Sequence, residues 1–415
     1  MKIYISGISG TGMGPLALMA KAAGLEVAGS DLNKGAIYDE LIRAGIEVFI
    51  GEQDGEFLQK KIQDGVEWFV YTSALPKTAP ELEVAKKAGL RVSKRDSLTD
   101  FLVRKLNLKM VAVAGTHGKT TTTAMIVWAC LKLGLPVAYV VGSTLGFAPS
   151  GNYKEGDEYF IYEADEYDRN FLEFYPWLSV ITSVSYDHPD IYKTREDYEA
   201  AFEEFRRQSE NVLEVTDAEG PDTSRFSLAG EARRQDAAYA LGAVLTICQD
   251  LMMQFRAGVP DFDEVIRILN EFPGVGRRFE KINDGVYTDY AHHPEEIKAT
   301  MDVALDECKM RGYKGVVVVY QPHQNTRQHE VRDGYVDAFD GAEKVYWLPT
   351  YLTRENLELE ILEPEELARE VKNAEVAELN NALFGELKKW REDGYLVLLM
   401  TAGPADAEFR DRFGA

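Results

Sequence analysis

The chain has few cysteines, few histidines and no long apolar run. Its 415 residues include 3 cysteines and 6 histidines. Cys130, Cys248 and Cys308 are far apart and odd in number, which disfavours a disulfide framework and fits reduced thiols. No apolar run approaches the ~20 residues of a membrane helix. Because the first predicted strand starts at Lys2 and leaves no room for a signal peptide, we expect a cytoplasmic protein without membrane insertion.

Positive charge is also scarce. Lysine and arginine number 46 against 69 aspartates and glutamates, so the net charge is −23. This balance disfavours nucleic acids and anionic membranes as partners. It does not exclude phosphate ligands, because glycine-rich loops bind phosphate through backbone N–H groups. The length suits two or three domains, and a hydrophobic content of 45% can supply their cores.

Apolar strands alternate with helical segments along the chain. We expect strands at 2–8, 25–29, 68–72, 110–114, 159–162 and 179–183, then four more at 286–289, 315–320, 344–348 and 395–400. Such alternation predicts parallel sheets whose ligands lie beyond the carboxyl ends of the strands. We therefore predict an α/β protein of three domains, at 1–104, 105–276 and 277–415, with a hinge at 273–276. The outer two should be Rossmann-like, and the central one a P-loop ATPase-like parallel sheet.

The strongest motif is a phosphate loop at 114–123. Its small residues let the backbone wrap a phosphate, and the helix that follows directs its N-terminus at the anion. We expect Lys119 to reach the β- and γ-phosphates of ATP, and Thr120 or Thr121 to offer a hydroxyl to Mg²⁺. Val113 departs from the general pattern, which has a glycine there, and a tight turn before an ordinary helix is the alternative. The expected ATP contacts in this loop are Gly115, Thr116, His117, Gly118, Lys119, Thr120 and Thr121.

This loop resembles that of the Mur ligase family, and other motifs of the family follow in order over nearly the whole chain. They are 7–13, 29–31, 71–76, 163–166, 187–188, 276–280 and 289–294. Each motif alone is weak, but the ordered set is specific, and its N-terminal part resembles the muramate-specific branch. The resemblance implies an ATP- and Mg²⁺-dependent ligase that joins L-alanine to UDP-N-acetylmuramate through an acyl phosphate in peptidoglycan synthesis. We expect a monomer or a homodimer, and the sequence does not decide between them.

Acidic and histidine side chains follow two central strands. Glu163 follows an apolar strand, where a carboxylate can hold Mg²⁺. Each of the nearby acids Asp165, Glu166 and Asp168 is more simply a solvated loop charge. Histidine is an unusual Mg²⁺ ligand, so chemistry alone favours a hydrogen-bonding role for His188, whereas the resemblance implies a second Mg²⁺ there. The expected metal-binding residues are Thr120, Glu163 and His188.

The resemblance also implies residues for the other ligands. The UDP-sugar should contact Gly10, Thr11, Gly12, Asp31 and Ser73. Arg278 should contact ATP with help from Asp289, unless it lies in an exposed basic turn. Tyr290, His292 and Arg327 should lie near the incoming amino acid, unless the adjacent histidines His292 and His293 are ordinary loop residues. The implied catalytic residues are Lys119, Glu163, His188 and Arg278.

Several positions depart from the family pattern. Gln324 stands where a second arginine is usual. The adenine signature is missing, because Ala232, Arg233 and Asp236 occupy its His-Asn…Asn positions. The stretch 211–226 looks shortened. Specificity for the nucleotide base is therefore open. Three alternative functions also remain: a ligase that reattaches a recycled tripeptide to the same sugar, a nucleotide-binding homologue with degraded catalysis, and a dinucleotide-dependent oxidoreductase. The second phosphate loop disfavours the oxidoreductase.

Overall fold

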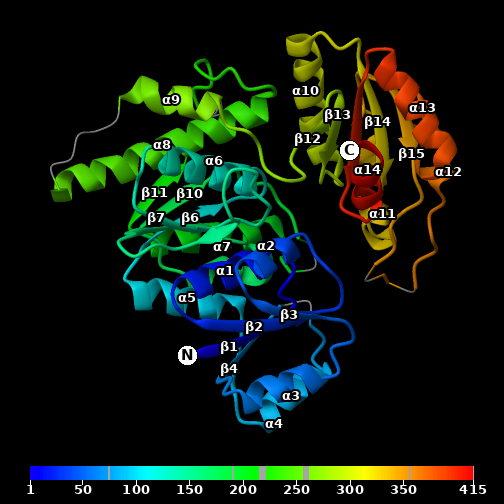
Figure 1. The fold of residues 1–415 in the computed structure, drawn as a ribbon. Coiled ribbons are helices and arrows are strands. Elements are labelled where there is room, and N and C mark those ends of the chain that lie inside the picture. Colours follow the sequence, from blue (N-terminus) through cyan, green and yellow to red (C-terminus); the bar gives the residue numbers. More distant parts are fainter. Residues whose placement is uncertain are drawn as a thin grey trace. The chain divides into compact units, whose positions relative to one another are not determined.

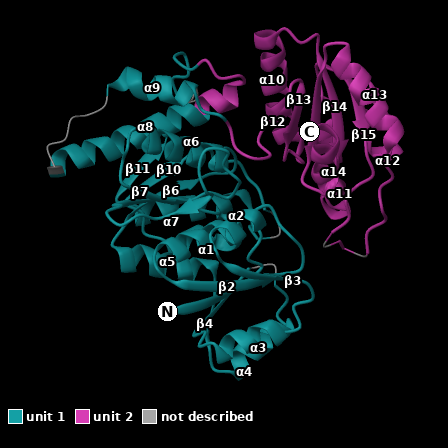
Figure 2. Cartoon of the chain, viewed as in Figure 1, with its two compact units in different colours: residues 1–226, 236–273 teal, residues 227–235, 274–415 magenta. Residues whose placement is uncertain are grey.

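The computed structural model describes residues 1–72, 75–188, 191–214, 221–255, 261–353, 355–356 and 358–414. It divides into two compact units, one of 1–226 with 236–273 and one of 227–235 with 274–415 (Figure 2). The first unit holds two sheets and the second unit holds one. Every predicted strand is present, with ends shifted by two residues at most. None of the described helices is long and apolar enough to cross a bilayer.

The N-terminal sheet is parallel, in the order β3-β2-β1-β4-β5, as a Rossmann-like half predicts. Its strands are β1 (Lys2–Ser6), β2 (Glu26–Asp31), β3 (Glu47–Ile50), β4 (Trp68–Tyr71) and β5 (Arg91–Lys94). Its helices are α1 (Gly14–Ala22), α2 (Tyr38–Arg43), α3 (Glu56–Gln63), α4 (Pro80–Lys87) and α5 (Arg95–Leu106). Side chains alternate along β1, so Ile3 and Ile5 pack with residues of α1 and α5, while Tyr4 packs with residues of α3 and α4. The labelled helices lie around this sheet in Figure 1.

The middle sheet has the order β11-β10-β6-β9-β7-β8, and only its short β7–β8 pair is antiparallel. Its strands are β6 (Lys109–Ala114), β7 (Val137–Val140), β8 (Gly151–Asn152), β9 (Tyr159–Glu163), β10 (Leu178–Ile181) and β11 (Asn211–Glu214). Its helices are α6 (Lys119–Lys132), α7 (Arg195–Gln208), α8 (Glu231–Phe255) and α9 (Phe262–Asn270), with a 3₁₀ segment η1 (Tyr167–Glu173). The strands that carry the phosphate loop and Glu163, β6 and β9, are therefore neighbours.

The N-terminal and middle sheets share one continuous core. Leu16 of α1 and Leu98 of α5 belong to the same buried cluster as Phe160 of β9. The backbones come very close at Gly151, where an added Cβ would lie 1.8 Å from the carbonyl oxygen of Pro15. Only glycine fits such an approach. The sugar-binding and ATP-binding segments predicted from the sequence therefore belong to one packed body.

The second unit is a three-layer sandwich around a sheet in the order β12-β13-β17-β14-β15-β16. Its strands are β12 (Glu280–Asn283), β13 (Val286–Asp289), β14 (Val316–Gln321), β15 (Ala342–Trp347), β16 (Ala374–Val376) and β17 (Leu396–Thr401). Its helices are α10 (Pro294–Arg311), α11 (Asn325–Val331), α12 (Pro364–Leu367), α13 (Asn381–Glu392) and α14 (Ala405–Phe413), with a 3₁₀ turn η2 (Arg332–Tyr335). The prediction of four strands was wrong, because the two edge strands β12 and β16 are only four and three residues long and neither is a buried apolar run.

Candidate active site

The phosphate loop lies between β6 and α6 and depends on two glycines. Gly115 and Gly118 have φ values of +136° and +80°, in the region that favours glycine. A Cβ on Gly115 would lie 2.3 Å from Oγ1 of Thr182, which follows β10. Ser183 also supports the loop, since its carbonyl oxygen accepts from the N–H of Thr116 at 3.0 Å. The loop is thus a preformed cradle at the N-terminus of a 14-residue helix, the arrangement that suits a phosphate.

Lys119 forms an ion pair with a buried carboxylate. Its ammonium lies 2.9 Å from Oε1 of Glu166, whose side chain is 1% exposed. Burial alone would lower the pKa of Lys119, but the charge and hydrogen bond of Glu166, together with the charges of Glu163 and Asp165, outweigh burial and raise that pKa. Burial would likewise raise the pKa of Glu166, yet Lys119 and His188 hold it below its usual range. Both groups are therefore charged, and Lys119 has the state that phosphate binding requires.

Glu163 lies at the end of β9, beside the first turn of α6. Its Oε1 accepts from the Thr120 hydroxyl at 2.9 Å, while its Oε2 is buried and has no hydrogen-bond partner among the described residues. The backbone leaves room for this carboxylate at Gly142, where a Cβ would lie 2.7 Å from Oε2. A hydroxyl and a half-satisfied carboxylate side by side fit a Mg²⁺ site.

His188 faces the same cluster from the segment after β10. Its Nε2 lies 3.6 Å from Oε1 of Glu166, and its backbone has an unusual φ of 58°. Such strain persists where the surroundings over-determine a position, as they often do at functional sites. Among the described residues no group of three or more His, Cys, Asp and Glu side chains forms a ready metal cage. A cation here would therefore take further ligands from phosphate, substrate or water oxygens.

The expectation that Glu166 is a solvated loop charge was wrong. Strand alternation cannot place it, because β9 ends at Glu163 and the chain turns before η1. Asp165 and Asp168 are partly exposed, and Asp168 pairs with Lys94 of the N-terminal domain at 2.9 Å. Of these acids only Glu166 is buried among functional side chains.

The glycine-rich loop after β1 lies close to an arginine that sequence analysis overlooked. A Cβ on Gly12 would lie 3.1 Å from Nη1 of Arg95, and the same guanidinium lies 3.8 Å from Asp165. Asp31 fastens the loop, since its Oδ2 accepts from the N–H and hydroxyl of Ser9 at 3.0 and 2.7 Å. The carbonyl oxygen of Gly10 accepts from the backbone N–H of Gly14, and Thr11 is exposed. Ser73 lies outside the described residues. Arg95 thus links the predicted sugar loop to the Glu163 segment.

In the second unit, the predicted residues gather at the carboxyl ends of β13 and β14. Asp289 accepts from the backbone N–H groups of Phe279 and Ala291, both at 2.7 Å, so it ties the arginine-bearing turn to the next turn. The guanidinium of Arg278 lies 5.4 Å from the ring centroid of Tyr290.

His292 is mostly buried, and three charged groups of that unit act on its pKa. Burial lowers its pKa, Glu296 opposes this effect, and the charges of Arg327 and Arg278 reinforce it. Its Nδ1 lies 3.2 Å from Oε2 of Glu296. A neutral imidazole that feels the charges of two guanidinium groups can help to recognise an anionic ligand such as an amino acid's carboxylate.

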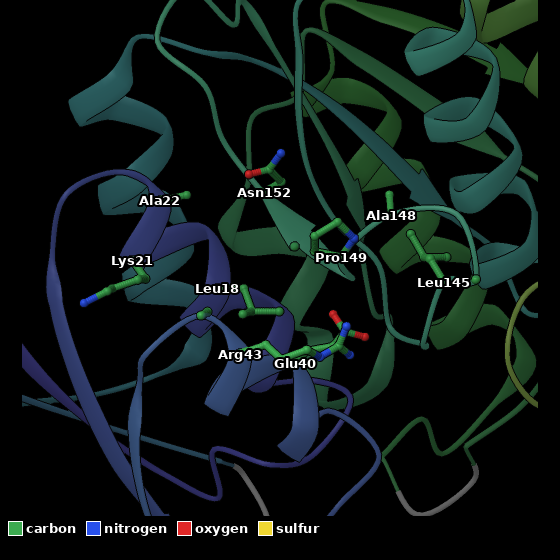
Figure 3. A pocket seen from close by; sticks show the side chains of 12 residues that line it. Leu18, Lys21, Ala22, Glu40, Arg43, Leu145, Ala148, Pro149 and Asn152 are labelled. Carbon is green, nitrogen blue, oxygen red and sulfur yellow. The ribbon is translucent and has the colours of Figure 1, made fainter.

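A hollow also lies at the junction of the N-terminal and middle domains (Figure 3). Its lining includes Leu18, Arg43, Leu145 and Asn152. Beside it the carboxylate of Glu40 accepts from both the N–H and the hydroxyl of Ser150 at 2.7 Å, which fixes the junction. The hollow lies at the C-terminal half of α1, whereas the glycine loop precedes its N-terminus, so this hollow is separate from the clusters above.

Three family profiles match successive parts of the chain. They are "Mur ligase family, catalytic domain" at 2–105, "Mur ligase middle domain" at 113–234 and "Mur ligase, glutamate ligase domain" at 277–403. The UDP-N-acetylmuramate–L-alanine ligase of Clostridium perfringens is 30% identical over 398 residues, or 85% of this chain and 84% of that one. The chain belongs to the Mur ligase family. It is therefore an ATP-dependent ligase.

Solved structures of the family share the fold. The UDP-N-acetylmuramate–alanine ligase of Thermotoga maritima matches 100% of this chain and 98% of its own, with a TM-score of 0.78 and 23% identity. A murein peptide ligase of Psychrobacter arcticus matches 100% of this chain and 99% of its own, with a TM-score of 0.64 and 22% identity. These likenesses confirm the three-domain α/β architecture predicted from the sequence.

Asp236, which we expected at one position of the adenine signature, lies beside the phosphate loop. Its Oδ1 accepts from Oγ1 of Thr122 at 3.2 Å, and it lies 2.3 Å from where a Cβ on Gly118 would stand. This carboxylate is buried against the phosphate loop and the helix that follows it. An ionised carboxylate only accepts hydrogen bonds, so it cannot make the paired donor and acceptor contacts of an amide.

Proposed function

We propose that this ligase joins L-alanine to the carboxylate of UDP-N-acetylmuramate at the expense of ATP, in peptidoglycan synthesis. The observation that carries the proposal is the cluster of Lys119, Thr120, Glu163 and His188 around the phosphate loop. The relatives with this activity, similar over most of their length, support the choice of substrates. An intact cluster also argues against the alternative of degraded catalysis.

The proposed reaction has two steps. A carboxylate oxygen of the sugar attacks the γ-phosphorus, the bond to the β-phosphate oxygen breaks, and ADP leaves with an acyl phosphate formed. The amine of alanine then attacks the acyl carbon, the C–O bond breaks, phosphate leaves and the amine loses a proton. Lys119 carries positive charge to the transferring phosphoryl group, and the loop N–H groups orient it. Mg²⁺, held by Thr120, Glu163 and His188, would neutralise further charge.

The ligands would be divided among the domains. Residues 1–104 would bind the UDP-sugar through Gly10, Gly12 and Asp31, and 105–276 would bind ATP. Residues 277–415 would supply Arg278 for the phosphates, together with Tyr290, His292 and Arg327 for the amino acid. Arginine suits both tasks, because its fork of donors matches phosphate and carboxylate oxygens.

Gly12→Val should separate the first two of these sites. The added side chain would fill the space beside Arg95 that the sugar's pyrophosphate would otherwise approach. We expect UDP-N-acetylmuramate to bind at least about tenfold more weakly, roughly 1.4 kcal/mol, with ATP affinity unchanged. Calorimetry measures both affinities. Gly146→Val is the control, since its Cβ meets nothing within 4 Å. If Gly12→Val weakened the binding of UDP-N-acetylmuramate and of ATP equally, the assignment of the two ligands to separate domains would be contradicted.

Base specificity should be relaxed. The carboxylate of Asp236 is engaged with Thr122 and cannot pair with adenine as an amide does. The base would then be held by apolar packing and backbone groups, which discriminate weakly. We expect GTP to support ligation within about tenfold of ATP in kcat/KM, about 1.4 kcal/mol. A preference for ATP on the order of 1,000-fold would show that another part of the chain recognises adenine.

Acceptor choice tests the function directly. Phosphate release is measured with ATP, Mg²⁺, UDP-N-acetylmuramate and either L-alanine or the recycled tripeptide. We expect kcat/KM for L-alanine to exceed that for the tripeptide by at least about 100-fold, a difference of some 2.7 kcal/mol. The reverse preference would establish the tripeptide-reattaching activity, which the fold of the murein peptide ligase keeps as the second candidate. If neither L-alanine nor the tripeptide supports phosphate release, both proposed activities are overturned.

A further inference from the structure

Glu166 lies between two groups of the proposed reaction without being placed to react itself. Its Oε1 is 2.9 Å from the Lys119 ammonium and 3.6 Å from Nε2 of His188. Its backbone is fixed, because the buried hydroxyl of Tyr192 donates to its carbonyl oxygen at 2.6 Å. Its side chain is 1% exposed, so water does not compete for this carboxylate.

The ammonium of Lys119 already has three acceptors. They are Oε1 of Glu166 at 2.9 Å and the carbonyl oxygens of Gly115 and Thr116 at 2.6 and 3.4 Å. An ammonium has three N–H donors, so a phosphate can gain one only by displacing an acceptor. Glu166 is the one charged acceptor of the three. If a phosphate took the place of Glu166 on the Lys119 ammonium, the buried Glu166 carboxylate would lose the Lys119 charge and would lie beside a new anion.

Two carboxylate oxygens of the cluster are already unsatisfied. Oε2 of Glu163 and Oε2 of Glu166 are both buried, and neither has a hydrogen-bond partner within the described part of the chain. A buried charge that loses its partner is strongly destabilising. A divalent cation relieves this cost, since carboxylate oxygens are its preferred ligands. A divalent cation in this cluster could therefore satisfy carboxylate oxygens that the described side chains leave without a partner.

We propose that Glu166 makes triphosphate binding conditional on a divalent cation. The inference rests on the proposed ATP site. Without a cation, the triphosphate must take Lys119 from Glu166 and leave that buried carboxylate with only the His188 imidazole beside it, 3.6 Å away. With a cation, Glu166 gains a new partner directly or through His188, and Lys119 passes to the phosphate. Glu166 is a positioning residue that acts through Lys119 and His188, and its effect is a coupling between two ligands, which must be reciprocal.

The test compares ATP affinities with and without Mg²⁺ in the full-length protein. Calorimetry is run in excess EDTA and in excess Mg²⁺ on wild type, Glu166→Gln and Glu173→Gln. Glu173 lies exposed in the same segment η1 and is the matched control. We expect Mg²⁺ to strengthen ATP binding to wild type and to Glu173→Gln. In Glu166→Gln the ratio of ATP affinity in Mg²⁺ to ATP affinity in EDTA should be about tenfold smaller than in wild type. The main cause should be tighter ATP binding in EDTA, because the neutral amide leaves no negative charge behind when Lys119 moves to the phosphate.

A second variant guards against a folding defect. Glu166→Asp keeps the charge, so it should keep most of the Mg²⁺ dependence that Glu166→Gln loses. Thermal melting checks that each variant is folded. The inference is overturned if Glu166→Gln keeps the wild-type ratio of affinities, or if its two affinities fall by the same factor, as a purely structural role would require. If wild type binds ATP in neither condition, the proposed ATP site is overturned as well. If Glu166→Gln binds Mg²⁺-ATP normally and keeps the wild-type coupling, only this inference is overturned.

Discussion

Lys119→Ala is expected to lower the turnover of this ligase by at least about 100-fold, or about 2.7 kcal/mol. The ammonium is charged and lies within the phosphate loop, so its loss removes a contact that strengthens as charge develops on the transferring phosphoryl group. Steady-state phosphate release gives kcat, and a melting curve confirms that the variant is folded.

Lys132→Ala provides the control for the Lys119 variant. Lys132 ends the same helix α6 and is exposed, so its replacement should leave turnover within about twofold of wild type. A folded Lys119→Ala protein with near wild-type kcat would contradict the placement of the phosphoryl group at this loop. Loss in both variants would indicate damage to α6 rather than to the site.

Glu163→Gln and His188→Ala should each raise the Mg²⁺ concentration for half-maximal rate by on the order of tenfold or more. Glu163 lies beside the Thr120 hydroxyl with a buried oxygen unsatisfied, and His188 faces the same space across Glu166. Rates are measured across a Mg²⁺ series at saturating ATP. A variant with a low rate at every Mg²⁺ concentration but an unchanged midpoint would mean that its residue does not hold the cation.

The strands and phosphate loop of the site were predictable because their signals are local. An apolar run that ends in Gly-Thr-His-Gly-Lys-Thr specifies a strand, a tight turn and a helix with its N-terminus free. Glu163 was predictable for the same reason, as the polar residue that ends an apolar strand. By contrast, β12 and β16 pair with a neighbour on one side only. Each is at most four residues long and has one exposed charged residue, so no apolar run marks them.

The contacts of Glu166 and Arg95 could not be predicted, because they depend on chain geometry beyond the strands. Glu166 lies three residues past β9, where the period-two alternation has ended. Arg95 begins a helix of the N-terminal domain, and its proximity to Asp165 arises only once the two sheets share a core. Three acids in four positions gave no local reason to single out Glu166.

The central claim is ligation through an acyl phosphate, and transfer of an oxygen isotope tests it most directly. UDP-N-acetylmuramate labelled with ¹⁸O in its carboxylate is incubated with ATP, Mg²⁺ and L-alanine, and the released phosphate is analysed by mass spectrometry. If the carboxylate attacks the γ-phosphorus and the C–O bond later breaks, each phosphate must carry one oxygen from the sugar. We predict one ¹⁸O per phosphate and one retained in the amide product. Phosphate without label, alongside formation of the amide, would contradict the account.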